Sequence, residues 1–326
     1  MFLINSNGII RKFNSTNIRI AVFMISNQRI TLPNLKKGDT VAIVAPAGRV
    51  DREKVEAALT MLHKWNFDVE LGQNLFQQYY NFAGNDQQRA SDLQTMMDNP
   101  KVKAILCARG GYGTLRILDQ LDFTTFQQHP KWLIGFSDIT VLHAHLNNVL
   151  QIPSIHGAMT GAFLNSPASV ESLRRIIFGD PINYHLPSLS TLNRNGSGEG
   201  ILIGGNISLL YALNGSPEEI KTEGKILFLE EIGEYLYHLD RMLWQFKRAG
   251  KLSKLAGLII GGLTDMKDNP IPFGLSAQEI IYEHIKEYDY PVCFDFPTGH
   301  DNNNQALILG TRVSLQVNAN SISLFT

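Results

Sequence analysis

Ser137 is the residue whose type and position best suit nucleophilic chemistry. It directly follows an apolar run, 133–136, and precedes a helical pattern, so we expect it at a strand-to-helix turn. Such a turn holds a hydroxyl outside the sheet, beside helix N–H groups that favour a developing negative charge. The segment resembles the hydrolase motif G-x-S-x-G, although Ile139 takes the place of the second glycine. On this local pattern alone, capping of the helix by Ser137 or Asp138 is the better explanation.

A serine nucleophile needs a base, and the base needs an orienting acid. His300 is the candidate base because it follows a predicted strand, 292–296, at the sheet edge where α/β folds collect their active sites. A loop histidine bonded to neighbouring Asp and Asn side chains explains it about as well. Glu230 is the candidate acid, as the first polar residue after the apolar strand 225–229. Its neighbour Glu231 is expected to be structural or to face a substrate.

The turn Arg109-Gly110-Gly111-Tyr112-Gly113 follows another predicted strand, 102–107. It matches neither the dinucleotide-binding motif nor the P-loop, so a nucleotide phosphate is weakly indicated. Adjacent glycines let a backbone N–H approach a ligand closely. Gly110 or Gly111 is therefore a candidate oxyanion donor beside the N–H of Asp138, and a turn chosen for its conformation alone is the alternative.

Cysteine and metal chemistry are not expected. Cys107 precedes a turn and could rival Ser137 as a nucleophile, but it lies in an apolar run where free cysteines are usually core residues. With Cys293 it forms neither a disulfide framework nor a zinc pattern, which suits a reducing compartment. His143 and His145 point to different helix faces and make a poor metal pair. We expect no cofactor and no metal.

The elements that must position these residues alternate between strands and helices. Apolar strands are predicted at 41–45, 67–71, 102–107 and 132–136, with helices after Asp51 and at 87–98 and 139–149. This alternation indicates βαβ units, a mostly parallel sheet and the α/β class.

The chain length of 326 residues suggests two domains. Residues 31–165 form the predicted N-terminal domain, which carries Ser137. Residues 166–198 are turn-rich and weakly patterned, which indicates an inter-domain linker. Residues 199–326 form the predicted smaller α/β domain, with strands near 225–229, 258–261 and 292–296, a helix at 235–249 and a hairpin over 313–324.

Composition excludes some classes of partner. The chain has 29 Lys+Arg against 30 Asp+Glu, and its basic pairs are scattered, so we expect no nucleic-acid binding. No apolar stretch approaches the roughly 20 residues that span a bilayer, so we expect no membrane partner.

Residues 1–30 precede the regular pattern and are expected to lie outside the fold. Their one compact apolar stretch, 18–25, comes late, contains Arg19 and lacks a following cleavage pattern, so it is a poor secretory signal. Either these residues form an extension or Met24 is the true start. The lack of a convincing export signal favours a cytoplasmic location.

Several spaced blocks together resemble the LD-carboxypeptidases, serine peptidases that include muramoyltetrapeptide carboxypeptidase and the microcin self-immunity proteins. The resemblance covers the chain from about Leu32 and rests on blocks at 38–48, 108–113, 134–138, 204–210, 228–231, 239–243 and 299–300.

The resemblance implies a Ser-Glu-His triad of Ser137, Glu230 and His300. It implies an N-terminal domain like flavodoxin or a class I glutamine amidotransferase, a smaller C-terminal α/β domain, a triad completed across the boundary and a homodimer. The implied reaction releases the C-terminal D-alanine of a murein tetrapeptide during cell-wall recycling. Arg109 is then a candidate cation for the substrate carboxylate, although it could equally brace its own loop.

Two other functions stay open. Within the family, the chain could hydrolyse a peptidyl-adenylate antibiotic, which needs a platform that stacks the nucleobase, and no segment clearly supplies one. Outside it, a non-catalytic two-domain binder of small molecules would not need Ser137 and His300 to meet.

Overall fold

The computed structural model describes residues 2–4, 10–12 and 30–326, which belong to two separate units, Met1–Thr31 and Leu32–Thr326. In the first unit, β1 (Phe2–Ile4) pairs antiparallel with β2 (Ile10–Lys12). Met24 and the stretch 18–25 lie outside the described residues. No helix within the described ranges is long and apolar enough to cross a membrane.

The first sheet of the larger unit is mostly parallel. Its strand order is β13-β7-β6-β5-β3-β4, and only β13 runs antiparallel to its neighbour. The strands are β3 (Thr40–Val44), β4 (Asp68–Leu71), β5 (Val102–Cys107), β6 (Trp132–Gly135), β7 (Ser154–His156) and β13 (Leu307–Leu309). Apart from exposed Lys103 and half-buried Thr40, β3, β5 and β6 are buried along their length, as their continuous apolar runs predict.

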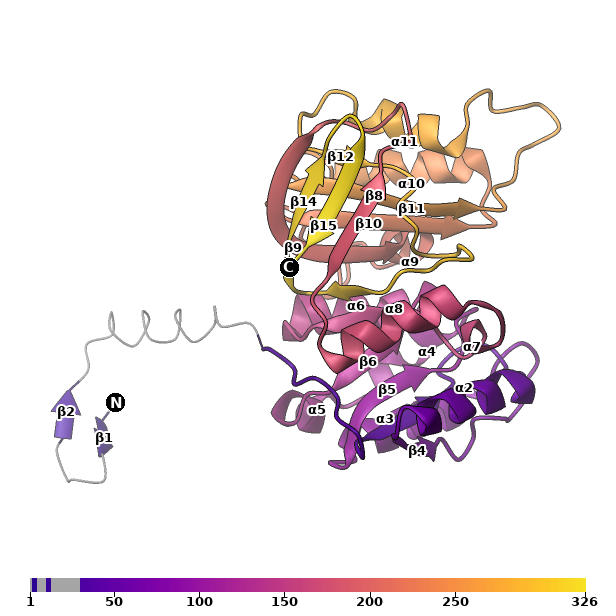
Figure 1. The fold of residues 1–326 in the computed structure, drawn as a ribbon, viewed down its shortest axis with the longest axis vertical. Helices are drawn as coiled ribbons and strands as arrows, with labels where there is room; N and C mark the ends of the chain where they lie inside the picture. The colour runs from indigo at the N-terminus through magenta and orange to yellow at the C-terminus, as the bar shows by residue number, and fades with distance from the viewer. Residues whose placement is uncertain (1, 5–9, 13–29) are drawn as a thin grey trace. The chain divides into compact units, whose positions relative to one another are not determined.

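Short and long helices connect these strands (Figure 1). They are α2 (Arg52–Lys64), α3 (Asp86–Asp98), α4 (Thr114–Ile117), α5 (Thr124–Gln128), α6 (Thr140–Ala144), α7 (Ala162–Asn165) and α8 (Pro167–Phe178), with the 3₁₀ turns η1 (Leu118–Gln120) and η2 (Ser137–Ile139) and the π-helical turn η3 (His145–Leu150). The helix predicted at 139–149 is thus divided between η2, α6 and η3.

The second sheet is mixed, with the strand order β12-β11-β10-β9-β14-β15-β8. The strands β9 to β12 are parallel, whereas β14, β15 and β8 join them as an antiparallel extension. Its strands are β8 (Asn183–Pro187), β9 (Gly196–Asn206), β10 (Ile226–Ile232), β11 (Gly257–Thr264), β12 (Val292–Cys293), β14 (Arg312–Val317) and β15 (Ser321–Phe325), and its helices are α9 (Ile207–Ala212), α10 (Leu236–Arg248) and α11 (Ala277–Ile285). The predicted C-terminal hairpin is confirmed as β14–β15.

The segment predicted as an irregular linker, 166–198, is instead largely ordered into elements. It contains the twelve-residue helix α8 and the edge strand β8. The helix buries Val170, Leu173, Ile176 and Ile177, which share one face, and Pro167 takes the N-terminal position where a missing N–H costs nothing. Proline marked the start of this helix rather than a break in structure.

A second correction concerns the C-terminal region. Residues 199–326 were expected in one domain, but β13 pairs with β7 in the first sheet. The chain therefore crosses between sheets after β12 and returns for β14. The mixed α/β class with parallel strands is as predicted, and the finer likeness to flavodoxin or glutamine amidotransferases stays a prediction.

Candidate active site

Ser137 lies at a sharp turn between β6 and the helical segment η2–α6. Its φ of +63° is in the left-handed region, which costs energy for a residue with a side chain. Since Asp138 lies in the first turn of the helical segment, its N–H is among those that lack an intrahelical partner. The turn therefore presents a hydroxyl next to a helix N-terminus.

His300 connects this hydroxyl to a buried carboxylate. Its Nε2 is 3.0 Å from Ser137 Oγ, and its Nδ1 is 2.6 Å from Glu230 Oε2. Glu230 is fully buried, and its Oε1 has no hydrogen-bond partner among the described residues. The structure thus brings together the three residues that the sequence singled out from three distant segments.

The electrostatics of His300 follow from these contacts. Burial lowers the pKa of its imidazole, but the hydrogen bond and charge of Glu230, with the charge of Glu231, outweigh that effect, so the pKa is raised. The Phe136 ring packs edge-on against the imidazole, with 5.0 Å between ring centroids. Nδ1 bonded to a carboxylate leaves Nε2 directed at Ser137, the orientation a general base needs.

The segment that carries His300 is held at the carboxyl ends of the second sheet's strands. Thr298 O accepts the Gly262 N–H at 2.9 Å, and the Thr264 hydroxyl donates to the His300 carbonyl. Gly299 has a φ of +95°, and a Cβ there would lie 2.7 Å from Glu230 Cβ. Only glycine lets the backbone pass this close to the carboxylate that orients the imidazole.

The glycine turn packs directly on the serine. A Cβ at Gly110 would lie 2.9 Å from Ser137 Cβ, 3.1 Å from Ser137 Oγ and 3.3 Å from the Asp138 nitrogen. The buried Asp138 carboxylate accepts the Thr114 N–H at 2.8 Å, which ties the far end of the turn to the serine segment. Burial raises the pKa of Asp138, and its hydrogen bonds to Thr114 oppose that shift. The sequence pattern allowed Asp138 to cap the helix, but in the structure its side chain accepts the Thr114 N–H and makes no capping bond.

Glu231 is placed differently from Glu230. Its Oε1 accepts from Asn206 Nδ2 at 2.9 Å, and its Oε2 accepts the N–H and hydroxyl of Ser208, both at 2.8 Å. The residue is buried, and these groups belong to the first turn of α9. Of the two expectations, the structural role fits these contacts, so we do not retain Glu231 as a substrate contact.

The remaining candidates are also located. Arg109 is exposed and donates to the Arg49 carbonyl at 2.8 Å, so it braces its loop while staying accessible. Cys107 is fully buried, and burial raises the pKa of its thiol far above the neutral range, so it is a core residue. Within residues 30–326 and the two short N-terminal strands, no cluster of three or more His, Cys, Asp or Glu could hold a metal ion.

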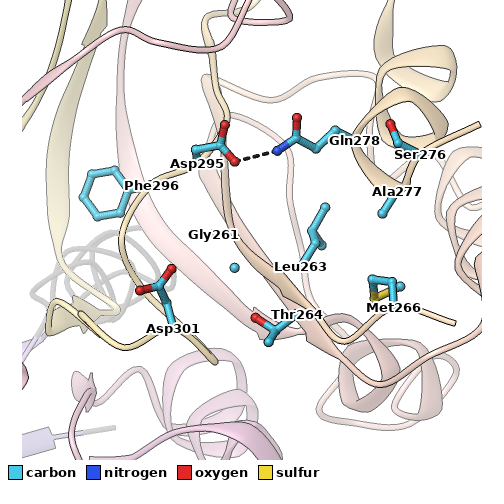
Figure 2. A pocket seen from close by; sticks show the side chains of 11 residues that line it. Gly261, Leu263, Thr264, Met266, Ser276, Ala277, Gln278, Asp295, Phe296 and Asp301 are labelled. Atoms are coloured by element: carbon cyan, nitrogen blue, oxygen red, sulfur yellow. Dashed lines mark hydrogen bonds between the residues drawn. The ribbon is translucent and has the colours of Figure 1, made fainter. Parts of the chain in front are cut away.

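Two cavities adjoin the segment that carries His300, and Asp301, the next residue in the chain, lines both. One, of about 480 Å³, lies at the end of β11 and is lined among others by Thr264, Asp295 and Gln278. Figure 2 shows this cavity, with the hydrogen bond between Asp295 and Gln278 above Asp301 and Thr264. The other, of about 350 Å³, is lined among others by Arg109 and Phe136.

A hydroxyl, an imidazole and a carboxylate bonded in this order characterise the serine hydrolases. Two family models match the chain, the LD-carboxypeptidase N-terminal domain over residues 41–157 and the LD-carboxypeptidase C-terminal domain over residues 199–315. The chain belongs to the LD-carboxypeptidase family, and it is an LD-carboxypeptidase of the serine type. The resemblance drawn from the sequence blocks is confirmed.

Relatives of known name agree with this assignment. A probable murein peptide carboxypeptidase of Bacillus subtilis is 36% identical over 287 residues, covering 86% of this chain and 90% of that protein. The murein tetrapeptide carboxypeptidase of Pseudomonas aeruginosa is 32% identical over 295 residues, covering 85% and 93%.

Solved structures give the same fold. The muramoyltetrapeptide carboxypeptidase from Oxalobacter formigenes has a TM-score of 0.79 at 28% identity, covering 88% of this chain and 98% of that chain. The microcin C7 self-immunity protein has a TM-score of 0.80 at 20% identity, covering 91% and 98%. The second likeness concerns the fold alone.

Proposed function

We propose that this enzyme releases the C-terminal D-alanine from murein tetrapeptides, with Ser137 as nucleophile, His300 as general base and Glu230 as orienting acid. The observation that carries the proposal is the continuous hydrogen-bonded line from Ser137 Oγ through His300 to Glu230. The names of the Bacillus and Pseudomonas relatives support the choice of substrate.

The reaction proceeds in two stages. His300 Nε2 takes the hydroxyl proton as Ser137 Oγ attacks the scissile carbonyl, and the N–H groups of Asp138 and of Gly110 or Gly111 stabilise the oxyanion. His300 returns the proton to the amide nitrogen, so D-alanine leaves and an ester remains on Ser137. A water molecule, deprotonated by His300, then attacks the ester, and the tripeptide leaves as Ser137 regains its proton.

The two alternatives are less well supported, the first because of the geometry and the second because of the similarities to known proteins. A non-catalytic binder has no need of a serine hydroxyl 3.0 Å from a histidine that is itself bonded to a fully buried glutamate. Hydrolysis of a peptidyl-adenylate is less well supported, because the microcin self-immunity protein is only 20% identical, whereas relatives above 30% are named for murein peptides.

Mass spectrometry of purified protein with tetrapeptides that carry L-Lys or meso-diaminopimelate and end in D-Ala tests the proposal. Wild-type protein is expected to release D-alanine, Ser137→Ala is expected to abolish release, and Ser91→Ala on the exposed face of α3 is the matched control. Release undiminished in Ser137→Ala refutes the nucleophile, and no release by wild type from either tetrapeptide refutes the substrate.

We further propose that the enzyme acts in the cytoplasm as a homodimer, as the family resemblance implies. A native mass of twice 36.4 kDa in analytical ultracentrifugation and recovery in the cytoplasmic fraction are the expected results.

A further inference from the structure

The 350 Å³ cavity lies where the leaving residue of a carboxypeptidase substrate must sit. It is lined by Phe136, Arg109 and Asp301, which are the chain neighbours of Ser137, Gly110 and His300. Only the amide nitrogen and one α-carbon separate the scissile carbonyl from the substrate's terminal carboxylate. The site for that carboxylate must therefore adjoin the nucleophile and the oxyanion turn, as this cavity does.

Two helices begin at the wall of this cavity. Its lining includes Asp51 at the start of α2 and Ser166 at the start of α8, helices of thirteen and twelve residues. Neither N-cap side chain accepts a backbone N–H of its helix, and the Asp51 carboxylate instead accepts from the Lys54 ammonium of the same helix at 2.6 Å. The free N–H groups in the first turn of each helix, which in α8 begin at Ala168 because Pro167 has none, thus lack the usual side-chain cap, and both helix dipoles favour an anion here.

Two buried polar groups at the same cavity have no partner. Ser169 Oγ and Asn304 Nδ2 make no hydrogen bond within the described part of the chain, although their residues are only 1% and 4% exposed. The orientation of Asn304 is fixed, because its Oδ1 accepts the Gly299 N–H at 2.9 Å, so its amide group offers donors. Buried donors without partners are costly unless a ligand satisfies them.

The charged groups of the lining balance. Arg109 and Lys54 supply two cations, and Asp51 and Asp301 two carboxylates, all on exposed residues except half-buried Lys54. A net positive field therefore does not select the ligand. Selection comes from directed donors, the two helix N-termini with Ser169 and Asn304, while Arg109 and Lys54 can turn toward a carboxylate.

From these contacts we propose that the cavity binds the terminal carboxylate of the substrate, with Ser169, Asn304 and the N-termini of α2 and α8 as its donors. The inference rests on the proposed function, since it names how that site recognises a free C-terminus. It explains why the enzyme removes a terminal residue, because an internal peptide bond offers no anion to these donors.

The test compares the tetrapeptide acid with its C-terminal amide. Wild-type kcat/KM is expected to be at least about a hundredfold higher for the acid, since several charged hydrogen bonds are lost in the amide. Ser169→Ala is expected to lower kcat/KM about tenfold for the acid and less than about twofold for the amide. Lys54→Met should act in the same direction, with Lys64→Met, exposed in the last turn of α2, as the matched control.

Binding to Ser137→Ala, measured by calorimetry with the same two peptides, separates this inference from the proposed function. Preference for the acid supports the carboxylate site even if the wild type releases no D-alanine. Equal binding of acid and amide, or equal losses for both peptides in Ser169→Ala, overturns it. Peptides with L-Lys in place of diaminopimelate show which substrate carboxylate the cavity binds. If the loss of kcat/KM in Ser169→Ala disappears with the L-Lys peptide, the cavity binds the side-chain carboxylate of diaminopimelate instead.

Discussion

Two adjacent glutamates differ in what their carboxylates contact, and we expect them to differ in function for that reason. Glu230 bonds to the imidazole of His300, and Glu231 bonds to the first turn of α9. We expect Glu230→Gln to lower kcat roughly a thousandfold, because the neutral amide neither stabilises the imidazolium nor fixes the ring. We expect Glu231→Gln to keep kcat within about fivefold but to lower the free energy of unfolding by about 2 kcal/mol. Steady-state kinetics and urea denaturation of both variants measure these effects.

The reverse pattern, with Glu231→Gln inactive and Glu230→Gln active, would show that the wrong carboxylate has been assigned. Folded protein is required for that conclusion, so near-ultraviolet circular dichroism of each variant is the control.

The raised pKa of His300 predicts the acid limb of the pH profile. A protonated imidazole cannot accept the Ser137 proton, so kcat/KM falls as the pH drops through the pKa of His300. Because Glu230 raises that pKa, the limb in wild type should lie above the ordinary histidine value of about 6.5. In Glu230→Gln the pKa of His300 should be lower, so the residual kcat/KM should begin to fall only at a lower pH than in the wild type. If kcat/KM fell at the same pH in both proteins, the proposed effect of Glu230 on the pKa of His300 would be contradicted.

Local apolar runs were enough to single out Ser137, Glu230 and His300 as candidates, but not the residues that line the neighbouring cavity. Ser137 and Glu230 directly follow apolar runs, and His300 follows one after the turn 297–299. Glu230 was expected just after its strand, but β10 continues to Ile232 and includes it. Ser169 and Asn304 carry no such signal, because one sits in the first turn of α8 and the other in an Asn-rich loop. Their meaning depends on lacking partners in a folded cavity, which no sequence pattern records.

The glycine turn that follows β5 can pack against Ser137 because Gly110 has no side chain. We expect Gly110→Ala to lower kcat about a hundredfold or more, since the new methyl group would lie against Ser137 Oγ and displace an oxyanion donor. Labelling of Ser137 by a fluorophosphonate should slow by a similar factor, because it uses the same oxyanion site.

Gly38→Ala is the control for strain alone. Gly38 has a φ of +87° and open space around its missing Cβ, so the substitution should cost about 1 kcal/mol of stability and leave kcat unchanged. An active Gly110→Ala enzyme, or equal losses of activity in both variants, would remove the turn from the proposed oxyanion site.

Local patterns predicted the elements of the parallel sheets better than the elements between them. The strand at 102–107 coincides with β5 because an apolar run buried on both faces needs no partner to be recognised. Strand β9 was missed, since Gly196, Gly198 and Gly200 weaken the pattern of a strand that the antiparallel partner β14 stabilises. Whether such a glycine-rich segment forms a strand depends on pairing with a distant part of the chain.

At the scale of the whole molecule, the candidate site depends on both sheets being held together. The segment with His300 leaves the second sheet after β12 and enters the first as β13. Close to Ser137, the Thr140 hydroxyl accepts the N–H of Asn206 at 3.1 Å, which links α6 to the end of β9. Both of these links therefore join the two sheets close to Ser137 and His300.

This coupling predicts that residues 32–326 unfold as one cooperative unit. Trp65 and Trp132 belong to the first sheet and its helices, and Trp244 lies on α10 beside the second. Thermal unfolding of Trp244→Phe, followed by fluorescence, reports on the first sheet, and the double variant Trp65→Phe and Trp132→Phe reports on the second. In each variant the fluorescence midpoint should agree within about 2 °C with the calorimetric midpoint of the same variant. Independent domains would unfold at separate midpoints and show two calorimetric peaks. A single transition is expected because unfolding of either half would break the β13–β7 pairing and the Thr140–Asn206 bond, and so destabilise the other half.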